Sequence, residues 1–447
     1  MRYQTKLYFI VISIIIISGC FKKPINSDDL SDVIYLQSAI NNGGSNLILK
    51  KRIYYIDSQI KLKSNQFIDG NGSTFIIKYT KSKFHVFNLS YLNNLSINNL
   101  SIIGDTNLTN LDKKTEKYII YINNSQKINL KNIRIKNSGF TPIHISDCKF
   151  ININECHFSN IGLSTANIPE YSYDGIFIGG YKETSDIKIT NCTFVKIGQS
   201  LNLDSDTPDD GDGIQLQVPN NSKLHKIEIS NCLFDSCTAR GIKIQSGFNL
   251  NIFNNRFHFC KTGIGITMAN IVKDTKITNS QFNNCYYAWG TNSNSTNIYA
   301  DNILFKNNRI ENCYAGYRSS GLSRLFNSVI DSNIVSNLKT FFLDGVFENS
   351  SITSNKIKDF GMANDPSLYM AILIADKSKN IIVSQNEIKT KSNSHVGIYF
   401  QENVVNPILE NNSISLRNSI DGNKYFIHLT KKDNTEILKL NKTYIIK

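Results

Sequence analysis

Three segments between residues 174 and 244 each begin with a charged residue and a glycine, and their side chains could perform chemistry together. They are residues 174–178 (DGIFI), 212–216 (DGIQL) and 240–244 (RGIKI). After the glycine, inward apolar residues alternate with outward side chains, which is the period of a β-strand. If these strands stack in parallel, Asp174, Asp212 and Arg240 form one charged column.

Two carboxylates on neighbouring strands of such a stack are suited to acid–base catalysis. Adjacent strands lie about 4.8 Å apart, so we expect the carboxyl groups of Asp174 and Asp212 within roughly 5 to 8 Å of each other. Close like charges raise the pKa of one carboxyl group, and a protonated acid beside an ionised one is the pair that glycosidases use. Asp209 and Asp210, just before Asp212, are further catalytic candidates.

Cations follow one strand later. Arg240 could bind a uronate carboxylate or stabilise developing negative charge, and Lys243 is expected to face outward beside it. An arginine–lysine pair can also serve β-elimination, in which one cation neutralises the carboxylate and the other group abstracts the adjacent proton. Glycoside hydrolysis and β-elimination therefore both remain open.

The outward face of the same sheet should bind the sugar chain. Three long turns, at residues 105–117, 162–173 and 198–211, all precede the same strand of their coil and should wall one edge of this sheet. Aromatic, amide and cationic side chains on a flat face offer stacking surfaces and hydrogen-bond partners. The expected substrate-binding residues are His144, Phe177, Gln215, Gln217 and Gln245, with Tyr171 and Tyr173 in the loop leading in.

The rest of the chain repeats a pattern that positions these strands. Alternating apolar strands lead to an asparagine turn and then to a short strand ending in Phe or Ile, as in residues 189–194 (ITNCTF) and 229–234 (ISNCLF). The tightest copies recur at about 24 residues, within the range of a solenoid turn. Asparagine tolerates the left-handed conformation, and its amide can hydrogen-bond to the copy above. A leucine-rich horseshoe is the alternative, but the leucine frame and the helical half are missing.

The sequence thus predicts an all-β fold, a right-handed parallel β-helix with three short strands per coil over residues 45–420. Residues 27–43 should form a capping helix with Val33, Leu36 and Ile40 on one stripe. Residues 425–447 should close the other end and shield the exposed sheet edge. Four cysteines share a repeat position with Ile, Leu and Phe in other copies, so we expect unpaired thiols in the core rather than disulfides or zinc.

The N-terminus resembles a bacterial lipoprotein signal. Arg2 and Lys6 precede an apolar stretch, and residues 17–20 (ISGC) resemble a lipobox, whose cysteine becomes lipidated. The resemblance implies a signal peptide at 1–19, a membrane anchor at Cys20, a short tether at 20–29 and a β-helix domain at 30–447. Phe21 is not the aspartate that retains lipoproteins at the inner membrane, which implies an outer-membrane lipoprotein, periplasmic or surface-exposed.

The formal charge of +13 allows two interpretations. Much of it is lysine scattered over strand faces, which favours a solvated basic surface. The alternative is attraction to an anionic polymer such as a uronic-acid polysaccharide. No recognition motif supports nucleic-acid binding.

The chain resembles the pectate-lyase superfamily in the order of its helix, glycine pair, short strands and D-G-N-G turn. Polygalacturonase-type glycoside hydrolases carry N-T-D-G, D-D and G-H-G on successive coils. Residues 173–175 (YDG) and 211–213 (GDG) match the first two in part, and 239–241 (ARG) lacks the histidine of the third. Mannuronan epimerases offer another partial match at residues 171–174 (YSYD). The resemblance implies the fold, while each catalytic set is incomplete.

The sequence therefore predicts a protein that binds an acidic polysaccharide and cleaves it by hydrolysis or elimination. A non-catalytic carbohydrate-binding or envelope scaffold is the rival. Asp-Gly is also ordinary turn chemistry, and Asp344-Gly345 is expected in the same frame without such neighbours. No cofactor is expected, although Asp204, Asp206, Asp209 and Asp210 could bind Ca²⁺.

Overall fold

The computed structural model describes most of the chain. The described residues are 31–78, 84–104, 118–162, 173–198, 211–219, 222–295, 298–361, 370–390, 396–417, 425–429 and 442–446. The predicted signal peptide and Cys20 lie outside these ranges, as do Tyr171 and the acidic residues Asp204, Asp206, Asp209 and Asp210.

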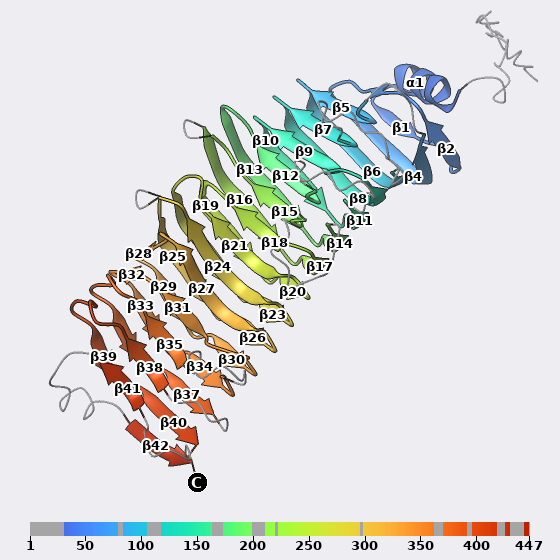
Figure 1. Ribbon diagram of the computed structural model, residues 1–447. Coiled ribbons are helices and arrows are strands. Elements are labelled where there is room, and N and C mark those ends of the chain that lie inside the picture. The colour runs from blue at the N-terminus through green and yellow to red at the C-terminus, as the bar shows by residue number, and fades with distance from the viewer. Residues whose placement is uncertain are drawn as a thin grey trace, which may run out of the picture.

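Strands stack in parallel into an elongated ladder with one helix at its N-terminal end (Figure 1). Each complete coil places one strand in sheet B and two strands, joined through a bend, in sheet A, which confirms three strands per coil. The described part of sheet B contains β3 (Ile60–Lys61), β5 (Phe87–Ser90), β7 (Ile120–Asn123), β9 (Ile143–Ser146), β12 (Ile176–Gly179), β15 (Ile214–Leu216), β18 (Arg240–Ile244), β21 (Thr262–Thr267), β24 (Tyr287–Ser293), β27 (Ala315–Gly321), β31 (Leu343–Gly345), β35 (Met370–Ile374), β38 (Val396–Phe400) and β41 (Tyr425–Leu429).

Sheet A is the longer of the two because every coil contributes twice to it. Its described strands are β1 (Asn46–Ile48), β2 (Ile53–Ile56), β4 (Gln66–Ile77), β6 (Asn93–Ile103), β8 (Gln126–Ser138), β10 (Lys149–Asn154), β11 (His157–Ile161), β13 (Glu183–Thr190), β14 (Thr193–Ile197), β16 (Lys223–Ser230), β17 (Leu233–Cys237), β19 (Gly247–Phe253), β20 (Arg256–His258), β22 (Val272–Thr278), β23 (Gln281–Asn283), β25 (Ala300–Lys306), β26 (Arg309–Glu311), β28 (Leu325–Phe326), β29 (Val329–Asp331), β30 (Ile334–Ser336), β32 (Phe347–Glu348), β33 (Ser351–Thr353), β34 (Lys356–Lys358), β36 (Ile382–Ser384), β37 (Glu387–Thr390), β39 (Ile408–Glu410), β40 (Ser413–Arg417) and β42 (Lys442–Ile446).

The N-terminal helix α1 (Asp32–Asn42) begins later than predicted. Ser31 caps it, because its hydroxyl accepts a hydrogen bond from the backbone N–H of Ile34. The predicted stripe of Val33, Leu36 and Ile40 is buried against the first coils. The helix ends where the N–H of Gly43 donates to the carbonyl of Ala39.

Asparagine occupies the predicted corner in the left-handed conformation. Asn191 and Asn231 have φ angles of 56° and 55°. The residue that follows the corner points into the core and forms a second ladder that the sequence did not indicate. There, the Nδ2 of Asn333 donates to Asn355 Oδ1 at 2.8 Å and the Nδ2 of Asn355 donates to Asn386 Oδ1 at 2.9 Å. Burial of these amides is tolerated because each one hydrogen-bonds to the amide of the asparagine in the next coil.

The cysteines confirm the prediction of core thiols. Cys148, Cys156, Cys192, Cys232, Cys237, Cys260, Cys285 and Cys313 are all buried and free. Ile197 pairs in register with Cys237, so a thiol takes the place of an apolar side chain. Burial raises the pKa of Cys237 and Cys260 well above its usual range, which keeps these thiols protonated.

The glycines that follow the charged residues are required by the packing of the core rather than by a turn. Phe158, Phe194, Phe234, Phe257 and Phe282 stack inside the coil with centroids 4.7 to 5.0 Å apart. A Cβ on Gly213 would lie 2.5 Å from Cδ1 of Phe234 and 2.6 Å from the carbonyl oxygen of Gly241. Glycine is therefore required at the bend because the ring fills the space that a side chain would occupy.

Two local predictions were wrong in detail. Residues 69–72 (DGNG) do not separate two strands, because β4 continues through them with a register shift and a left-handed Asn71. Strands β41 and β42 pair in parallel with β38 and β40, so the C-terminal segment extends both sheets by a further rung. The ladder thus runs past the predicted limit of residue 420.

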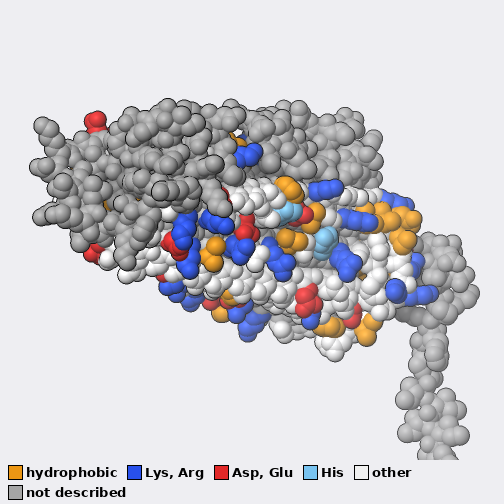
Figure 2. Space-filling model, turned by 90° about the horizontal axis from the view of Figure 1, so that it is seen from below, with side chains coloured by type: hydrophobic (Ala, Val, Ile, Leu, Met, Phe, Trp, Pro, Cys, Tyr) orange, Lys and Arg blue, Asp and Glu red, His pale blue; other side chains and the backbone are white. Residues whose placement is uncertain are grey.

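The described surface is mixed in charge. Figure 2 shows lysine and arginine side chains scattered among polar, acidic and hydrophobic ones over the described part of one face. Such mixing agrees with the interpretation of a solvated basic surface. Within the described ranges, no helix is long and apolar enough to cross a membrane.

Candidate functional site

The three charged residues of the predicted column lie on consecutive rungs of sheet B. Ile176 pairs with Ile214, and Ile214 pairs with Ile242, so the strands β12, β15 and β18 keep step. The N–H of Gly175 donates to the carbonyl of Asp212 and the N–H of Gly213 to that of Arg240. This register places the three residues on neighbouring rungs, while their catalytic roles stay a prediction.

Asp212 is the centre of a buried ion cluster. Its Oδ1 lies 3.5 Å from Nη1 of Arg240, and its Oδ2 lies 3.5 Å from Nζ of Lys243. The carboxylate is fully buried, and the side chains of the two cations are only 10 and 11% exposed. Two counter-charges offset the cost of burying a carboxylate away from water.

Asp174 lies one rung before Asp212 and is also fully buried. Its backbone N–H donates to the hydroxyl of Thr141 at 3.0 Å, which fixes the start of β12 against the preceding coil. The acidic pair thus faces one side of the sheet but is enclosed by protein atoms. Tyr173 is similarly buried, with its side chain close against Gly162, and does not offer an exposed stacking surface.

Outward side chains of sheet B form a second column beside the acidic one. His144 pairs with Phe177, Phe177 with Gln215, and Gln215 with Lys243, which is the predicted order. The His144 and Phe177 rings stack with centroids 4.8 Å apart. Nε2 of Gln215 donates to Oε1 of both Gln217 and Gln245, at 2.5 and 2.8 Å. Aromatic, amide and cationic groups therefore follow one another along the helix axis.

The aromatic end of this column is larger than predicted. Tyr121 precedes His144 in register, Tyr118 packs against both rings, and His85 stacks on Tyr121 and Tyr118. Burial among these rings, with a smaller contribution from His85, lowers the pKa of His144 to about 4, so the imidazole is neutral at pH 7. Its Nδ1 is buried without a hydrogen-bond partner among the described residues. His144 is part of an aromatic platform rather than an isolated exposed residue.

Beyond Lys243 the same column contains two glycines and then an arginine. Gly265 pairs with Gly290, and Gly290 pairs with Arg318. The missing side chains leave a hollow of about 180 Å³. It is lined by Arg240, Thr262, Gly265, Thr267, Tyr287, Gly290, Thr291, Asn292, Arg318 and Ser320. Apart from Arg240, these residues were missed, although the alignment of Gly265 with Lys243 in the repeat was a usable signal.

Asp344 does not repeat the Asp-Gly arrangement of the site, contrary to the sequence-based expectation. It pairs in register with Arg318 and so belongs to the column of Gln215 and Lys243 rather than to that of Asp174. Burial raises the pKa of its carboxyl group above its usual value.

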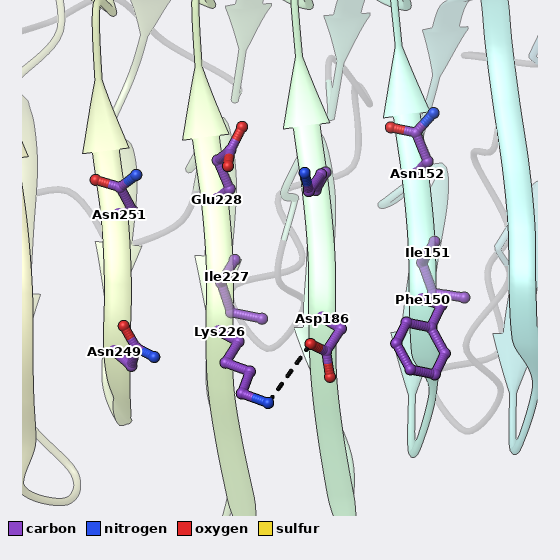
Figure 3. A pocket seen from close by; sticks show the side chains of 10 residues that line it. Phe150, Ile151, Asn152, Asp186, Lys226, Ile227, Glu228, Asn249 and Asn251 are labelled. Carbon is purple, nitrogen blue, oxygen red and sulfur yellow. Dashed lines mark ion pairs between the residues drawn. The ribbon is translucent and has the colours of Figure 1, made fainter.

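A larger hollow lies on the outer face of sheet A, away from the predicted site (Figure 3). Left-handed residues at Phe150, Asp186, Lys226 and Asn249 bend four successive coils and make this face concave. Its volume is about 460 Å³, and Nζ of Lys226 lies 3.8 Å from Oδ1 of Asp186 within it. Asp186 and Glu228 line the hollow from neighbouring rungs, but Glu228 pairs in register with Lys188, and Lys226 is the ion-pair partner of Asp186, so the two carboxylates do not face each other as the predicted chemistry requires.

Metal binding finds no support in the residues that the structure places. Among them, no group of three or more His, Cys, Asp or Glu side chains could hold an ion. The acidic residues considered for Ca²⁺ lie outside the described ranges, so that possibility stays a prediction.

Comparisons with known proteins agree with the fold. A profile of the right-handed β-helix region matches residues 93–302. A comparison with curated protein sequences finds no match to this chain.

Several solved structures are similar over most of the chain. A tailspike protein mutant of Escherichia coli bacteriophage HK620, in complex with a pentasaccharide, has 12% identity and a TM-score of 0.57, covering 93% of this chain and 75% of its own. A Yersinia enterocolitica family 28 exopolygalacturonase has 11% identity and a TM-score of 0.52, covering 86 and 76%. PfbA, a surface adhesin of Streptococcus pneumoniae, has 15% identity and a TM-score of 0.50, covering 92 and 94%.

At these identities the similarity concerns the fold alone. The chain is a right-handed parallel β-helix protein, as the sequence predicted.

Proposed function

We propose that this chain binds an acidic, uronate-containing polysaccharide along the outer face of sheet B and cleaves it at Asp174 and Asp212. The observation that supports this most directly is the order of side chains along one column, from Phe177 through Gln215 to Lys243. An aromatic ring offers a stacking surface to a sugar, an amide exchanges hydrogen bonds with its hydroxyls, and a cation pairs with its carboxylate.

The names of similar structures support carbohydrate as the ligand class. The tailspike mutant was solved with a pentasaccharide, and the exopolygalacturonase is named for a uronate polymer. Both share the β-helix scaffold, on which an outer sheet face can hold a linear polymer across several rungs.

In the proposed hydrolysis, one carboxyl group of the acidic pair protonates the leaving glycosidic oxygen. The other, ionised, either takes a proton from the water that attacks the anomeric carbon or attacks that carbon itself to form a glycosyl-enzyme that water then hydrolyses. Arg240 and Lys243 pair with the substrate carboxylate. In the elimination alternative, a base abstracts the proton from the carbon next to that carboxylate, a carbon–carbon double bond forms as the glycosidic oxygen leaves and takes a proton, and no water enters the product. Asp209 and Asp210 stay candidates for the same roles.

Cleavage requires substrate to reach Asp174 and Asp212. Both carboxylates are enclosed by protein atoms, so these atoms must move apart when the polymer binds. Phe177 and Gln217, in neighbouring columns of the same face, are half-exposed and need no such movement, whereas Gln215 and Lys243 are buried.

The test is activity on a panel of uronate polymers. We expect new reducing ends for hydrolysis, or ultraviolet absorbance of an unsaturated uronate for elimination. Asp174→Asn should lower the rate at least 100-fold, roughly the effect of losing a general acid or base. Asp331→Asn, in an ion pair on sheet A, is the matched control. No product from any polymer, or full activity of the Asp174 variant, would refute cleavage.

A non-catalytic carbohydrate-binding scaffold is the second candidate. The complete burial of Asp212 beside Arg240 and Lys243 favours it, because such a cluster can serve to hold two neighbouring coils together. This candidate predicts polymer binding without any product.

A further inference from the structure

The hollow on sheet B lies where an outward column loses its side chains over two rungs. Gly265 and Gly290 form its floor between Lys243 on one side and Arg318 on the other. Three strand spacings separate these cations, about 14 Å between Cα atoms. The volume of about 180 Å³ corresponds to about six water molecules and admits one sugar ring.

Each end of the hollow has a guanidinium group. The side chain of Arg240 crosses the first glycine so closely that a Cβ on Gly265 would lie 2.4 Å from Cδ of Arg240. This glycine therefore lets Arg240 reach over β21. Its charge is partly compensated, because Nη1 lies 3.5 Å from Asp212.

Arg318 is the more available cation. Its side chain is exposed, and its Nη1 donates to the Tyr287 hydroxyl at 2.8 Å, which holds the guanidinium beside the hollow. Asp344 lies one rung further and interacts electrostatically with Arg318, although the two do not form one of the close ion pairs found among the described residues. A cation fixed in place by a neutral partner can still bind an anion.

The walls suit a sugar ring. Tyr287 contributes an aromatic surface, while Asn292 and Ser320 are exposed polar groups in the neighbouring column. Thr267 also lines the hollow, and its buried Oγ1 has no hydrogen-bond partner among the described residues. An unsatisfied hydroxyl costs stability unless a ligand completes it.

We propose that this hollow is a subsite for one carboxylate-bearing sugar residue, with Arg318 as the main partner of the carboxylate and Thr267 as a hydroxyl partner. The proposal rests on the proposed function, in that the outer face of sheet B must hold the polymer. It adds that the face selects charged sugars at a defined place, with Arg318 five rungs from Phe177 of the aromatic platform.

The test measures the affinity of the full-length protein for uronate oligosaccharides and for their methyl esters, which keep the chain and remove the charge. The probes are oligomers of galacturonate, glucuronate and mannuronate, and the method is titration calorimetry. We expect the acid to bind at least tenfold more tightly than its ester. Arg318→Gln should remove this preference, whereas Arg309→Gln, an exposed arginine on sheet A, should keep it.

Thr267→Val separates binding from folding. The substitution keeps the shape and removes the unsatisfied hydroxyl, so we expect weaker binding of the acid with no loss of thermal stability. Equal binding of acid and ester, or an unchanged preference in the Arg318 variant, would overturn the subsite and leave polysaccharide binding intact. Failure of every oligosaccharide to bind would overturn both proposals.

Discussion

The carboxylate of Asp212 has two cations within reach and no exposed surface, so its contribution to stability can be measured apart from any catalytic role. Removing one partner of a buried ion pair leaves the remaining charge without compensation inside the protein. At this position two cations would lose their shared carboxylate.

We therefore expect Asp212→Asn to lower the free energy of unfolding by about 3 kcal/mol. Urea titration gives the value. Glu387→Gln, which removes an exposed ion pair with Lys389, should cost less than 1 kcal/mol. Equal effects of the two substitutions would contradict the ion cluster. Because Asp212→Asn is expected to destabilise the fold, the activity test uses Asp174→Asn instead.

The neutral imidazole of His144 makes stability depend on pH. Its pKa is about 4 in the folded protein and about 6.5 in the unfolded chain, so the unfolded state binds the proton first as pH falls. Stability from this group is complete above pH 6.5 and is lost progressively toward pH 4, by up to about 3 kcal/mol.

His144→Phe should therefore reduce the difference in unfolding midpoint between pH 7 and pH 5, because phenylalanine can stack on Phe177 without titrating. Burial also lowers the pKa of His85, so part of the dependence should persist. An identical pH dependence in the variant and the wild type would show that folding does not lower the pKa of His144.

At the residue scale, the sequence predicted which charges are neighbours but not what they contact. The two-residue period of a β-strand fixes the face of the sheet on which each side chain lies, so the order from His144 to Lys243 could be predicted from the sequence pattern. Side-chain torsions are not fixed by that period, which is why the pairing of Lys243 with Asp212 and the burial of Tyr173 could not be predicted.

Gly213, directly before β15, packs against the ring of Phe234 in β17, so that sheet B lies close to sheet A. The Cβ that Gly213 lacks would overlap the ring of Phe234 and the carbonyl of Gly241. Overpacking of this kind costs about 1 to 3 kcal/mol.

Gly213→Ala should thus destabilise the protein by about that amount, and less when Phe234 is replaced by leucine. A double-mutant cycle on the free energy of unfolding measures the coupling. Additive effects would show that the ring does not require the glycine. Gly44→Ala, where no atom lies within 4 Å but φ is +67°, provides a control for backbone strain alone.

At the element scale, the three-strand coil and the left-handed asparagine corners could be predicted because they repeat locally. The hollow could not, because it depends on two glycines and an arginine meeting in register over three coils. The ladder of inward asparagines was also missed. An asparagine can be assigned to the core only when the asparagine of the next coil is known to hydrogen-bond to it.

At the scale of the whole molecule, the parallel strands form one elongated ladder, and the proposed anchor precedes it in the sequence. We propose that Cys20 is lipidated and holds the protein at the outer membrane. Cys20→Ser should move the protein from the membrane fraction to the soluble fraction, as seen by immunoblotting after cell fractionation. Retention of the variant in the membrane fraction would contradict a lipid anchor at this residue.

The most direct test of the account is the position of a bound acidic oligosaccharide in a crystal structure of the complex. We expect the sugar chain to lie along the helix axis over sheet B, from Phe177 toward Arg318, with one carboxylate beside the Arg318 guanidinium. A chain bound in the hollow of sheet A, or anywhere else on the rod, would contradict the account.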